Sequence, residues 1–179
     1  SNGKGKAWDK IVKSIGIEPV VYDSDMVDAS IENMMDRLTY LGYYGSEIES
    51  VINVKKKNVS VSYNITLGKR FPIKDIEIIL PSEGTFADDF LADTSAMTIK
   101  IGDYLSEDIL ENETVRASAS LRNMGYYEFS KNNFFFEADT LSCPDSAILK
   151  MTINGYTRNE TPDRARAISR FTFNEVNIS

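Results

Sequence analysis

The stretch Leu38-Thr39-Tyr40-Leu41-Gly42-Tyr43-Tyr44 has a close echo later in the chain, Leu121-Arg122-Asn123-Met124-Gly125-Tyr126-Tyr127. Each stretch is predicted to end an amphipathic helix at its glycine and to open a strand with its two tyrosines. Glycine readily takes the left-handed conformation that closes a helix, and tyrosine suits a pleated, half-buried surface. We interpret six residues as this structural motif: Gly42, Tyr43, Tyr44, Gly125, Tyr126 and Tyr127.

The residues around these stretches repeat as well. Before each glycine, apolar and small residues recur at helical spacing, which predicts two long amphipathic helices with N-caps at Asp23 and Ser106. The matching positions, 83 residues apart, are Val27, Ile31, Met34, Leu38 and Leu41, then Leu110, Thr114, Ala117, Leu121 and Met124. After the glycines the offset grows to 88, so we expect a five-residue insertion, which we place in Leu141–Asp145.

Alternation of apolar and polar residues predicts the strands that follow. Val59, Val61, Tyr63 and Ile65 alternate with polar residues, and Ala147, Leu149, Met151 and Ile153 match them at the offset of 88. Strands are also expected at Ser46–Val54, Phe71–Ile78 and Asn132–Asp139, and short helices at Ala7–Ile15 and Phe86–Leu91. Phe171–Ile178 repeats the pattern of Phe71–Ile78, apolar for apolar and polar for polar.

Composition excludes several classes of function. The chain of 179 residues carries a net charge of −7, which argues against a nucleic-acid or anionic-lipid partner. It has no histidine and one cysteine, Cys143, so the usual general base, an internal disulfide and a cysteine-based zinc site are all absent. It contains no phosphate-binding loop and no nucleophile motif. We therefore expect no enzyme, no cofactor and no metal.

A helix that ends in Gly-Tyr-Tyr, then a hairpin, then a Phe-x-Ile-x-x-Ile strand resembles the POTRA (polypeptide-transport-associated) domain of BamA-like and TamA-like outer-membrane assembly proteins, in the bacterial surface antigen superfamily. Four segments carry the resemblance: Leu41–Tyr44, Gly68 with Phe71–Ile76, Gly102–Asp103 and Leu121–Tyr127. The resemblance implies an α+β fold of tandem β-α-α-β-β units. In each unit, two helices cover one face of a three-stranded mixed sheet.

We expect the following division of the chain. Residues 1–6 form a disordered tag, 7–69 a POTRA-like domain that lacks its first strand, and 70–157 a complete POTRA-like domain. Residues 158–169 form a polar linker, and 170–179 form the first strand of a following domain that this sequence does not contain.

The resemblance also implies a function: the periplasmic arm of an outer-membrane protein assembly or translocation factor. Such an arm would bind unfolded outer-membrane polypeptides, and accessory outer-membrane lipoproteins or a periplasm-spanning partner, by strand addition at sheet edges. Membrane attachment is expected only through a C-terminal barrel outside this sequence. The candidate edge-strand residues are Ile48, Ser50, Ile52, Val54, Phe134, Phe135 and Phe136.

Three alternatives remain open at this point. The first is the arm of a two-partner-secretion-type transporter, and the second is an unrelated α+β binding domain. The third is a cation-binding or acid–base site at Asp88, Asp89 and Asp93, against which we set the interpretation of these residues as a solvated helix face.

Overall fold

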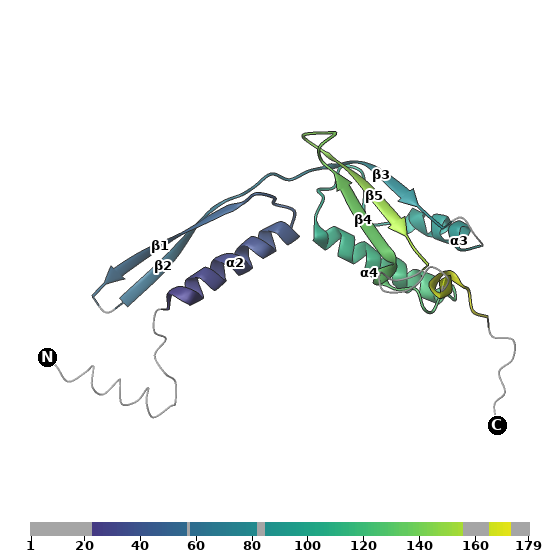
Figure 1. Cartoon of the computed structure of the whole chain (residues 1–179), viewed down its shortest axis with the longest axis horizontal. Coiled ribbons are helices and arrows are strands. Elements are labelled where there is room, and N and C mark those ends of the chain that lie inside the picture. The colour runs from purple at the N-terminus through teal and green to yellow at the C-terminus, as the bar shows by residue number, and fades with distance from the viewer. Residues whose placement is uncertain (1–22, 57, 82–84, 156–164, 173–179) are drawn as a thin grey trace, which may run out of the picture. The chain divides into compact units, whose positions relative to one another are not determined.

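We describe a computed structural model of the chain over residues 23–56, 58–81, 85–155 and 165–172 (Figure 1). The helix expected at Ala7–Ile15 lies outside these residues, as does most of the strand expected at Phe171–Ile178. The chain forms two compact units, which are described separately. The first comprises Ser1–Met35 and Ile48–Ile65, and the second comprises Asp36–Glu47 and Thr66–Ser179.

The first unit contains most of helix α2 (Ser24–Tyr40) and of the strands β1 (Glu47–Lys55) and β2 (Asn58–Thr66). The Asp23 carboxylate accepts a hydrogen bond from the Asp25 backbone N–H at 3.0 Å, as expected of an N-cap. β1 and β2 form a two-stranded sheet within the described residues. Most side chains of this sheet are exposed, and Val54 is 70% exposed.

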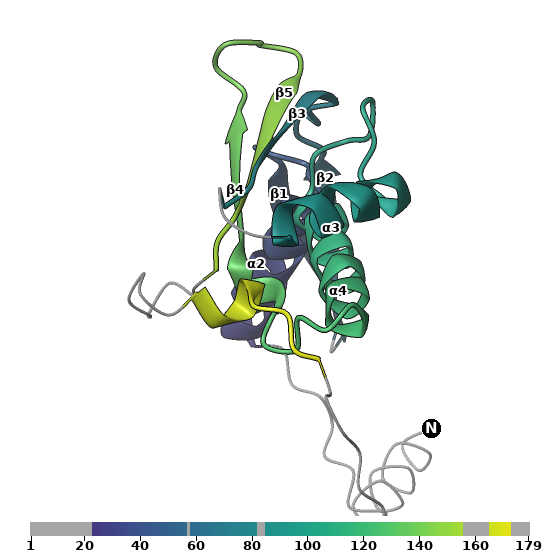
Figure 2. The ribbon, with the colours of Figure 1, turned by 90° about the vertical axis from the view of Figure 1, so that its right-hand side faces the viewer.

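The second unit contains β3 (Ile73–Ile79), α3 (Phe86–Asp93), α4 (Glu107–Asn123), β4 (Phe134–Asp139) and β5 (Ala147–Ile153). It also has three 3₁₀ turns: η1 (Thr94–Ala96), η2 (Lys131–Asn133) and η3 (Ala165–Ile168). The sheet order is β3-β5-β4, with β3 parallel and β4 antiparallel to β5. The expected mixed three-stranded sheet is confirmed, and Figure 2 shows α3 and α4 on one of its faces.

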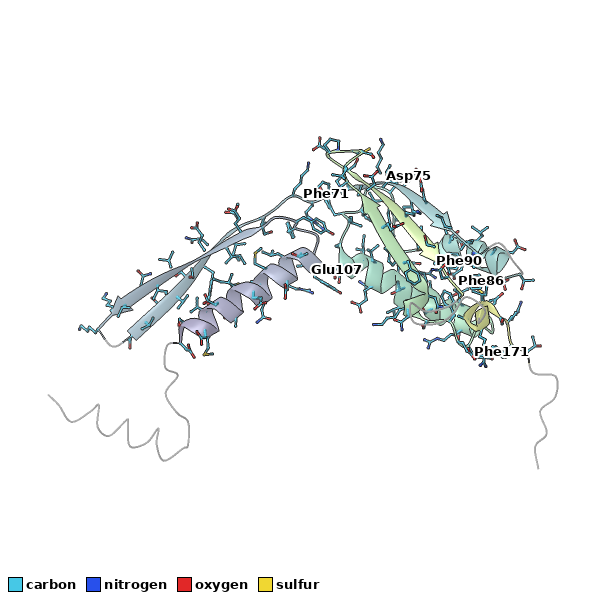
Figure 3. All side chains as sticks on the ribbon, in the orientation of Figure 1. Phe71, Asp75, Phe86, Phe90, Glu107 and Phe171 are labelled. Atoms are coloured by element: carbon cyan, nitrogen blue, oxygen red, sulfur yellow. The ribbon has the colours of Figure 1, made fainter. Side chains whose placement is uncertain are left out.

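The core of the second unit fills the space between this sheet and its helices. Every second residue of β5 points into it, so Ala147, Leu149, Met151 and Ile153 are at most 2% exposed. Phe86 and Phe90 enter the same core from α3 (Figure 3). The Phe86 ring meets the Tyr126 ring edge-on, with centroids 5.1 Å apart. Alternation in β5 and helical spacing in α3 and α4 therefore converge on one apolar layer.

Both long helices end as predicted. Gly42 and Gly125 have φ values of +84° and +105°, in the left-handed region. After each glycine, the tyrosine N–H returns to the helix, from Tyr43 to the Leu38 carbonyl at 2.8 Å and from Tyr126 to the Leu121 carbonyl at 3.1 Å. These are the hydrogen bonds of a Schellman motif. At the other end of α4, the Ser106 hydroxyl accepts from the Ile109 N–H.

The tyrosines do not open strands, contrary to the prediction. β1 begins at Glu47, five residues after Gly42, and β4 begins at Phe134, nine residues after Gly125. Part of the extra length of the second copy therefore precedes β4, where it forms η2, so the insertion is not confined to Leu141–Asp145. In each copy the Schellman motif uses the N–H of the first tyrosine, and in the first copy Tyr44 forms only an isolated antiparallel bridge with Lys69, so neither tyrosine pair begins a named strand.

The described part of the segment expected to be a polar linker, residues 158–169, is not free of the second unit. Ala167, in η3, is 7% exposed and belongs to the core cluster of the second unit. The Phe171 N–H donates to the Gly125 carbonyl at 2.9 Å. The described part of the segment therefore packs on the second unit, because its alanine and isoleucine cover apolar surface that a free linker would leave exposed.

Candidate peptide-binding edge and groove

β4 lies at an edge of the second unit's sheet, paired on one side with β5 and on its other side with no described strand. The opposite edge, formed by β3, is different. There the Gly102 N–H donates to the Ile73 carbonyl, and the Ile73 N–H donates to the Asp103 carbonyl, both at 2.8 Å. The connector before α4 therefore occupies backbone groups at the start of the β3 edge. An incoming strand meets more unpaired backbone along β4.

The three consecutive phenylalanines of β4 divide between the two faces of the sheet, as alternation requires. Phe134 is 8% exposed and lies in the core, and Phe136 packs against it from the same face. Their rings stack with centroids 6.2 Å apart. Phe135 is half-buried and belongs to neither core cluster.

A buried asparagine fixes the start of this edge strand. Asn133 is fully buried, and its amide N–H donates to the Asn154 carbonyl at 3.0 Å. Its side-chain oxygen accepts the Ser130 N–H at 3.0 Å, which completes a capping box around η2. The Asn154 N–H donates to the Asn133 carbonyl. Sequence reasoning missed Asn133, because a single asparagine in a polar stretch gives no signal of burial.

A groove of about 340 Å³ runs beside this edge, between β4 and α4. All its lining residues belong to the second unit: Tyr40, Glu107, Leu110, Glu111, Thr114, Lys131, Asn132, Phe134 and Phe136. Its apolar side comes from Leu110 and the two inward phenylalanines. The sequence placed Leu110 and Thr114 on the core face of a helix, and only the fold shows that they line a groove.

The polar rim of the groove carries two carboxylates and one ammonium group. Glu107 stands in the first turn of α4 (Figure 3), and Glu111 follows one turn later. The Glu111 carboxylate accepts the Tyr40 hydroxyl at 3.0 Å, and this hydrogen bond raises the pKa of Tyr40. Lys131 Nζ lies 3.8 Å from the other Glu111 oxygen. The rim is thus acidic overall, with one cation at the β4 end.

In the first unit, the predicted edge residues fall in β1, which is an edge of the two-stranded sheet. Ile48, Ser50, Ile52 and Val54 point to one face, since they alternate along the strand. Ile48 and Ser50 are half-buried, whereas Ile52 is 45% exposed.

The two tyrosine pairs make different packing and hydrogen-bond contacts in the two copies. The Arg70 guanidinium lies over the Tyr43 ring at 4.9 Å and over the Tyr104 ring at 4.2 Å. Tyr44 packs on Phe71, and burial raises the pKa of Tyr44. In the second copy, Tyr126 is fully buried and donates to an Asp89 oxygen at 2.6 Å. Tyr127 is exposed and contacts the Phe171 ring.

The aspartates of α3 form neither a cation site nor a purely solvated face. Asp93 is 7% exposed and pairs with Arg116 of α4 at 2.7 Å, and Asp89 accepts the buried tyrosine hydroxyl. Among the described residues, no group of three or more acidic, histidine or cysteine side chains is placed to hold a metal ion. The solvated-face interpretation was wrong for Asp93, since the guanidinium that pairs with it lies 23 residues away in the sequence.

Comparison with known proteins finds a family match for the first copy of the repeat. Residues 9–68 match the sequence profile of the POTRA family, described as "Surface antigen variable number repeat". Residues 9–68 are therefore similar to a POTRA domain. No curated protein matches the sequence significantly. In the described part of the chain, no helix has the length and apolar character needed to cross a bilayer.

Two similar solved structures come from Haemophilus species. One is the Haemophilus influenzae BamA POTRA3-5 crystal structure, with a TM-score of 0.48, 14% identity, and coverage of 78% of this chain and 54% of that one. The other is BamA from Haemophilus ducreyi lacking POTRA domains 1-3, with a TM-score of 0.42, 16% identity, and coverage of 78% and 24%. This chain spans about half the length of the first structure and a quarter of the second.

Proposed function

We propose that this chain is part of the periplasmic arm of an outer-membrane protein assembly or translocation factor. In this proposal it acts as a non-enzymatic scaffold that binds unfolded outer-membrane polypeptides by strand addition. The observation that carries the proposal is the unpaired edge of β4 beside the apolar groove lined by Leu110, Phe134 and Phe136. The POTRA match supports the assignment to an arm.

Strand addition at this edge fits the chemistry of outer-membrane clients. Main-chain hydrogen bonds give affinity with little dependence on sequence, while alternate side chains of the added strand enter neighbouring pockets. Transmembrane barrel strands alternate apolar and polar residues. An added strand of this kind would direct one row of apolar side chains over the groove. Its polar row would face solvent.

The acidic rim of the groove is expected to favour client strands that carry positive charge. Glu107 and Glu111 outnumber the one cation, Lys131, around the groove. A client strand with lysine or arginine at an end of its groove-facing row, next to the rim, is therefore favoured over one with an acidic residue there at low ionic strength. The accessory lipoproteins or periplasm-spanning partners expected from the sequence would bind other faces of the same arm.

We test this proposal by titrating the ¹⁵N-labelled chain with a peptide copied from an outer-membrane barrel strand. Amide shifts are expected to concentrate in Phe134–Asp139, with weaker shifts in β1. Shifts confined to β3, or spread evenly over the chain, would refute the proposal. A variant of the same peptide with aspartate at the end of its groove-facing row is expected to bind more weakly than the matched variant with lysine there.

Two adjacent proline substitutions, Glu137→Pro and Ala138→Pro, sharpen the test. Successive N–H groups of a strand point in opposite directions, so one of these two points to β5 and the other to the free edge. Proline at the free-edge position removes a donor that only the client uses, and it is expected to abolish binding while the fold is retained. Proline at the β5-facing position breaks the sheet itself. If the free-edge variant folds and still binds the peptide normally, β4 is not the binding edge.

A further inference from the structure

Arg70 is a cation that no carboxylate of the described residues neutralises. Its neighbour Lys69 is engaged, with Nζ 2.7 Å from an Asp145 oxygen. Arg70 itself has no hydrogen bond or ion pair to any residue that the structure describes. Three other arginines of the same unit do pair with carboxylates: Arg116, Arg166 and Arg170. The chain has 27 acidic and 20 basic side chains, so a shortage of carboxylates does not explain why Arg70 is left unpaired.

Two tyrosine rings hold the Arg70 guanidinium in place. Its Cζ lies 4.9 Å from the centroid of the Tyr43 ring and 4.2 Å from that of the Tyr104 ring, which is the range of a cation–π contact. The Nε atom is buried and has no hydrogen-bond partner among the described residues. The two Nη nitrogens are not buried in this way and have no described partner either, so they reach solvent.

Backbone hydrogen bonds on both sides of Arg70 fix the two rings. Tyr44 and Lys69, the residues after Tyr43 and before Arg70, exchange two backbone hydrogen bonds of 3.0 Å. On the other side, the Leu105 N–H donates to the Phe71 carbonyl at 2.8 Å. Arg70 and both rings belong to the second unit. The guanidinium is therefore ordered before any ligand arrives, which lowers the entropy cost of binding.

The exposed end of Arg70 has the chemistry of a carboxylate receptor. Two free Nη donors form a planar fork that matches the two oxygens of a carboxylate. A free phosphate is more often held by several converging donors, at a helix N-terminus or a backbone nest, and the adjacent cation Lys69 is already paired with Asp145. Tyr104 is 47% exposed and offers ring surface beside the fork. Arginine and tyrosine are also among the residues that contribute most at protein interfaces.

We propose that Arg70 and Tyr104 bind an acidic side chain of a partner polypeptide, with an apolar neighbour of that side chain on the exposed Tyr104 ring. Tyr43 serves as a positioning residue for the guanidinium. None of these three residues lines the groove beside β4. The groove has an acidic rim and this site has a cation, so the two sites select opposite charges on what they bind. The inference does not rest on strand addition at β4.

Arginine Nε–Hε signals in nuclear magnetic resonance test the proposal on the unmodified chain, since burial of the Arg70 Nε slows exchange of its proton with water. The probes are acetyl-Gly-Phe-Glu-Gly-amide and its glutamine analogue. The glutamate peptide is expected to shift the signals of Arg70 and the Tyr104 ring, and the glutamine peptide is expected to shift them several-fold less. Binding on the order of millimolar is sufficient for this measurement.

Three outcomes would overturn the proposal. In the first, neither peptide moves the Arg70 signal at tens of millimolar. In the second, the two peptides move it equally, so that the carboxylate is not what is recognised. In the third, inorganic phosphate at the same concentration and ionic strength shifts the Arg70 signal as much as the glutamate peptide does. That result would assign a general anion site and no polypeptide partner.

Substitutions separate the planar fork from the charge alone. Arg70→Gln is expected to abolish the preference for glutamate over glutamine. Arg70→Lys keeps the charge but lacks the fork, and it is expected to reduce the preference several-fold. Arg122→Gln is the control, because Arg122 is exposed in the last turn of α4, and it is expected to leave the preference unchanged. An unchanged preference in Arg70→Lys contradicts recognition by the fork.

The fold of each variant is checked by its amide spectrum. If Arg70→Gln does not fold, the unmodified chain and Arg70→Lys still decide the question. The proposed function is read at Phe134–Asp139 with a barrel-strand peptide, whereas this site is read at Arg70 and Tyr104. The failure of one proposal is therefore distinguishable from the failure of the other.

Discussion

Replacement of Arg116 by methionine is expected to destabilise the second unit strongly. The guanidinium Nη2 lies 2.7 Å from an Asp93 oxygen and 2.6 Å from a Glu113 oxygen. The two carboxylate side chains are only 5% and 2% exposed. Glu113 also accepts the Thr98 N–H at 2.8 Å, so the cluster joins α3, the connector and α4. Methionine keeps much of the aliphatic volume and removes only the charge and the donors.

The expected magnitude follows from burial. Removing one partner of a buried ion pair costs about 3–5 kcal/mol, because the remaining charge is left uncompensated. The Arg116 side chain is 23% exposed, so water screens the pair and the lower end of that range applies. A loss of about 3 kcal/mol lowers the melting temperature by roughly 10–25 °C for a domain of 60–100 residues.

The pH dependence gives a second signature. Burial alone would raise the pKa of Asp93, but hydrogen bonds from Arg116 and Ser120 outweigh it and hold the pKa below the usual value of 3.8. A carboxyl with a lowered folded pKa contributes stability above pH 3.8 and loses it as the pH falls below that value. Arg116→Met removes this contribution. The stability difference between the wild type and the variant is therefore largest at neutral pH and shrinks below pH 3.8.

Urea unfolding followed by near-ultraviolet circular dichroism measures the change, since Tyr126 is buried against Phe86 and reports on packing in the second unit. Arg122→Met is the matched control. It lies in the exposed last turn of the same helix and is expected to change the free energy of unfolding by less than about 0.5 kcal/mol. A loss below about 1 kcal/mol for Arg116→Met, or one that does not change between pH 7 and pH 3, would refute the reasoning.

Three further predictions concern the junctions and the edge strand. Gly68→Ala would place a Cβ 2.1 Å from the Tyr44 carbonyl oxygen, and it is expected to cost about 1–3 kcal/mol in thermal unfolding. Gly45→Ala, which meets no atom within 4 Å but has a φ of +74°, should cost only about 1 kcal/mol, and an equal loss in both would contradict the steric argument. Tyr126→Phe removes the hydrogen bond to Asp89 and is expected to cost about 1 kcal/mol in urea unfolding; no change would show that water replaces it. Phe134→Ala is expected to cost about 3–5 kcal/mol. Phe135→Ala, on the opposite face, should cost far less in the same assay, and the reverse order would mean that the facing of β4 is wrong.

The sequence determined the repeat and most of the secondary structure, because those features depend on local rules. Helical spacing located α4, and the two glycines marked helix ends whose backbone takes positive φ values. Alternation located β5 and predicted that its odd-numbered residues face a core. These patterns reflect side-chain geometry within one element, so no knowledge of distant residues was needed.

Only the tertiary structure decided where β4 begins, which carboxylates are buried and which residues share the groove. Asn133 is buried because its amide reaches Asn154, and Asp93 is buried because Arg116 meets it from another helix. The groove combines Leu110 with Phe136, which come from different elements. Such features depend on contacts between residues far apart in the chain. These contacts produce no periodic pattern in the sequence, so sequence patterns cannot predict them.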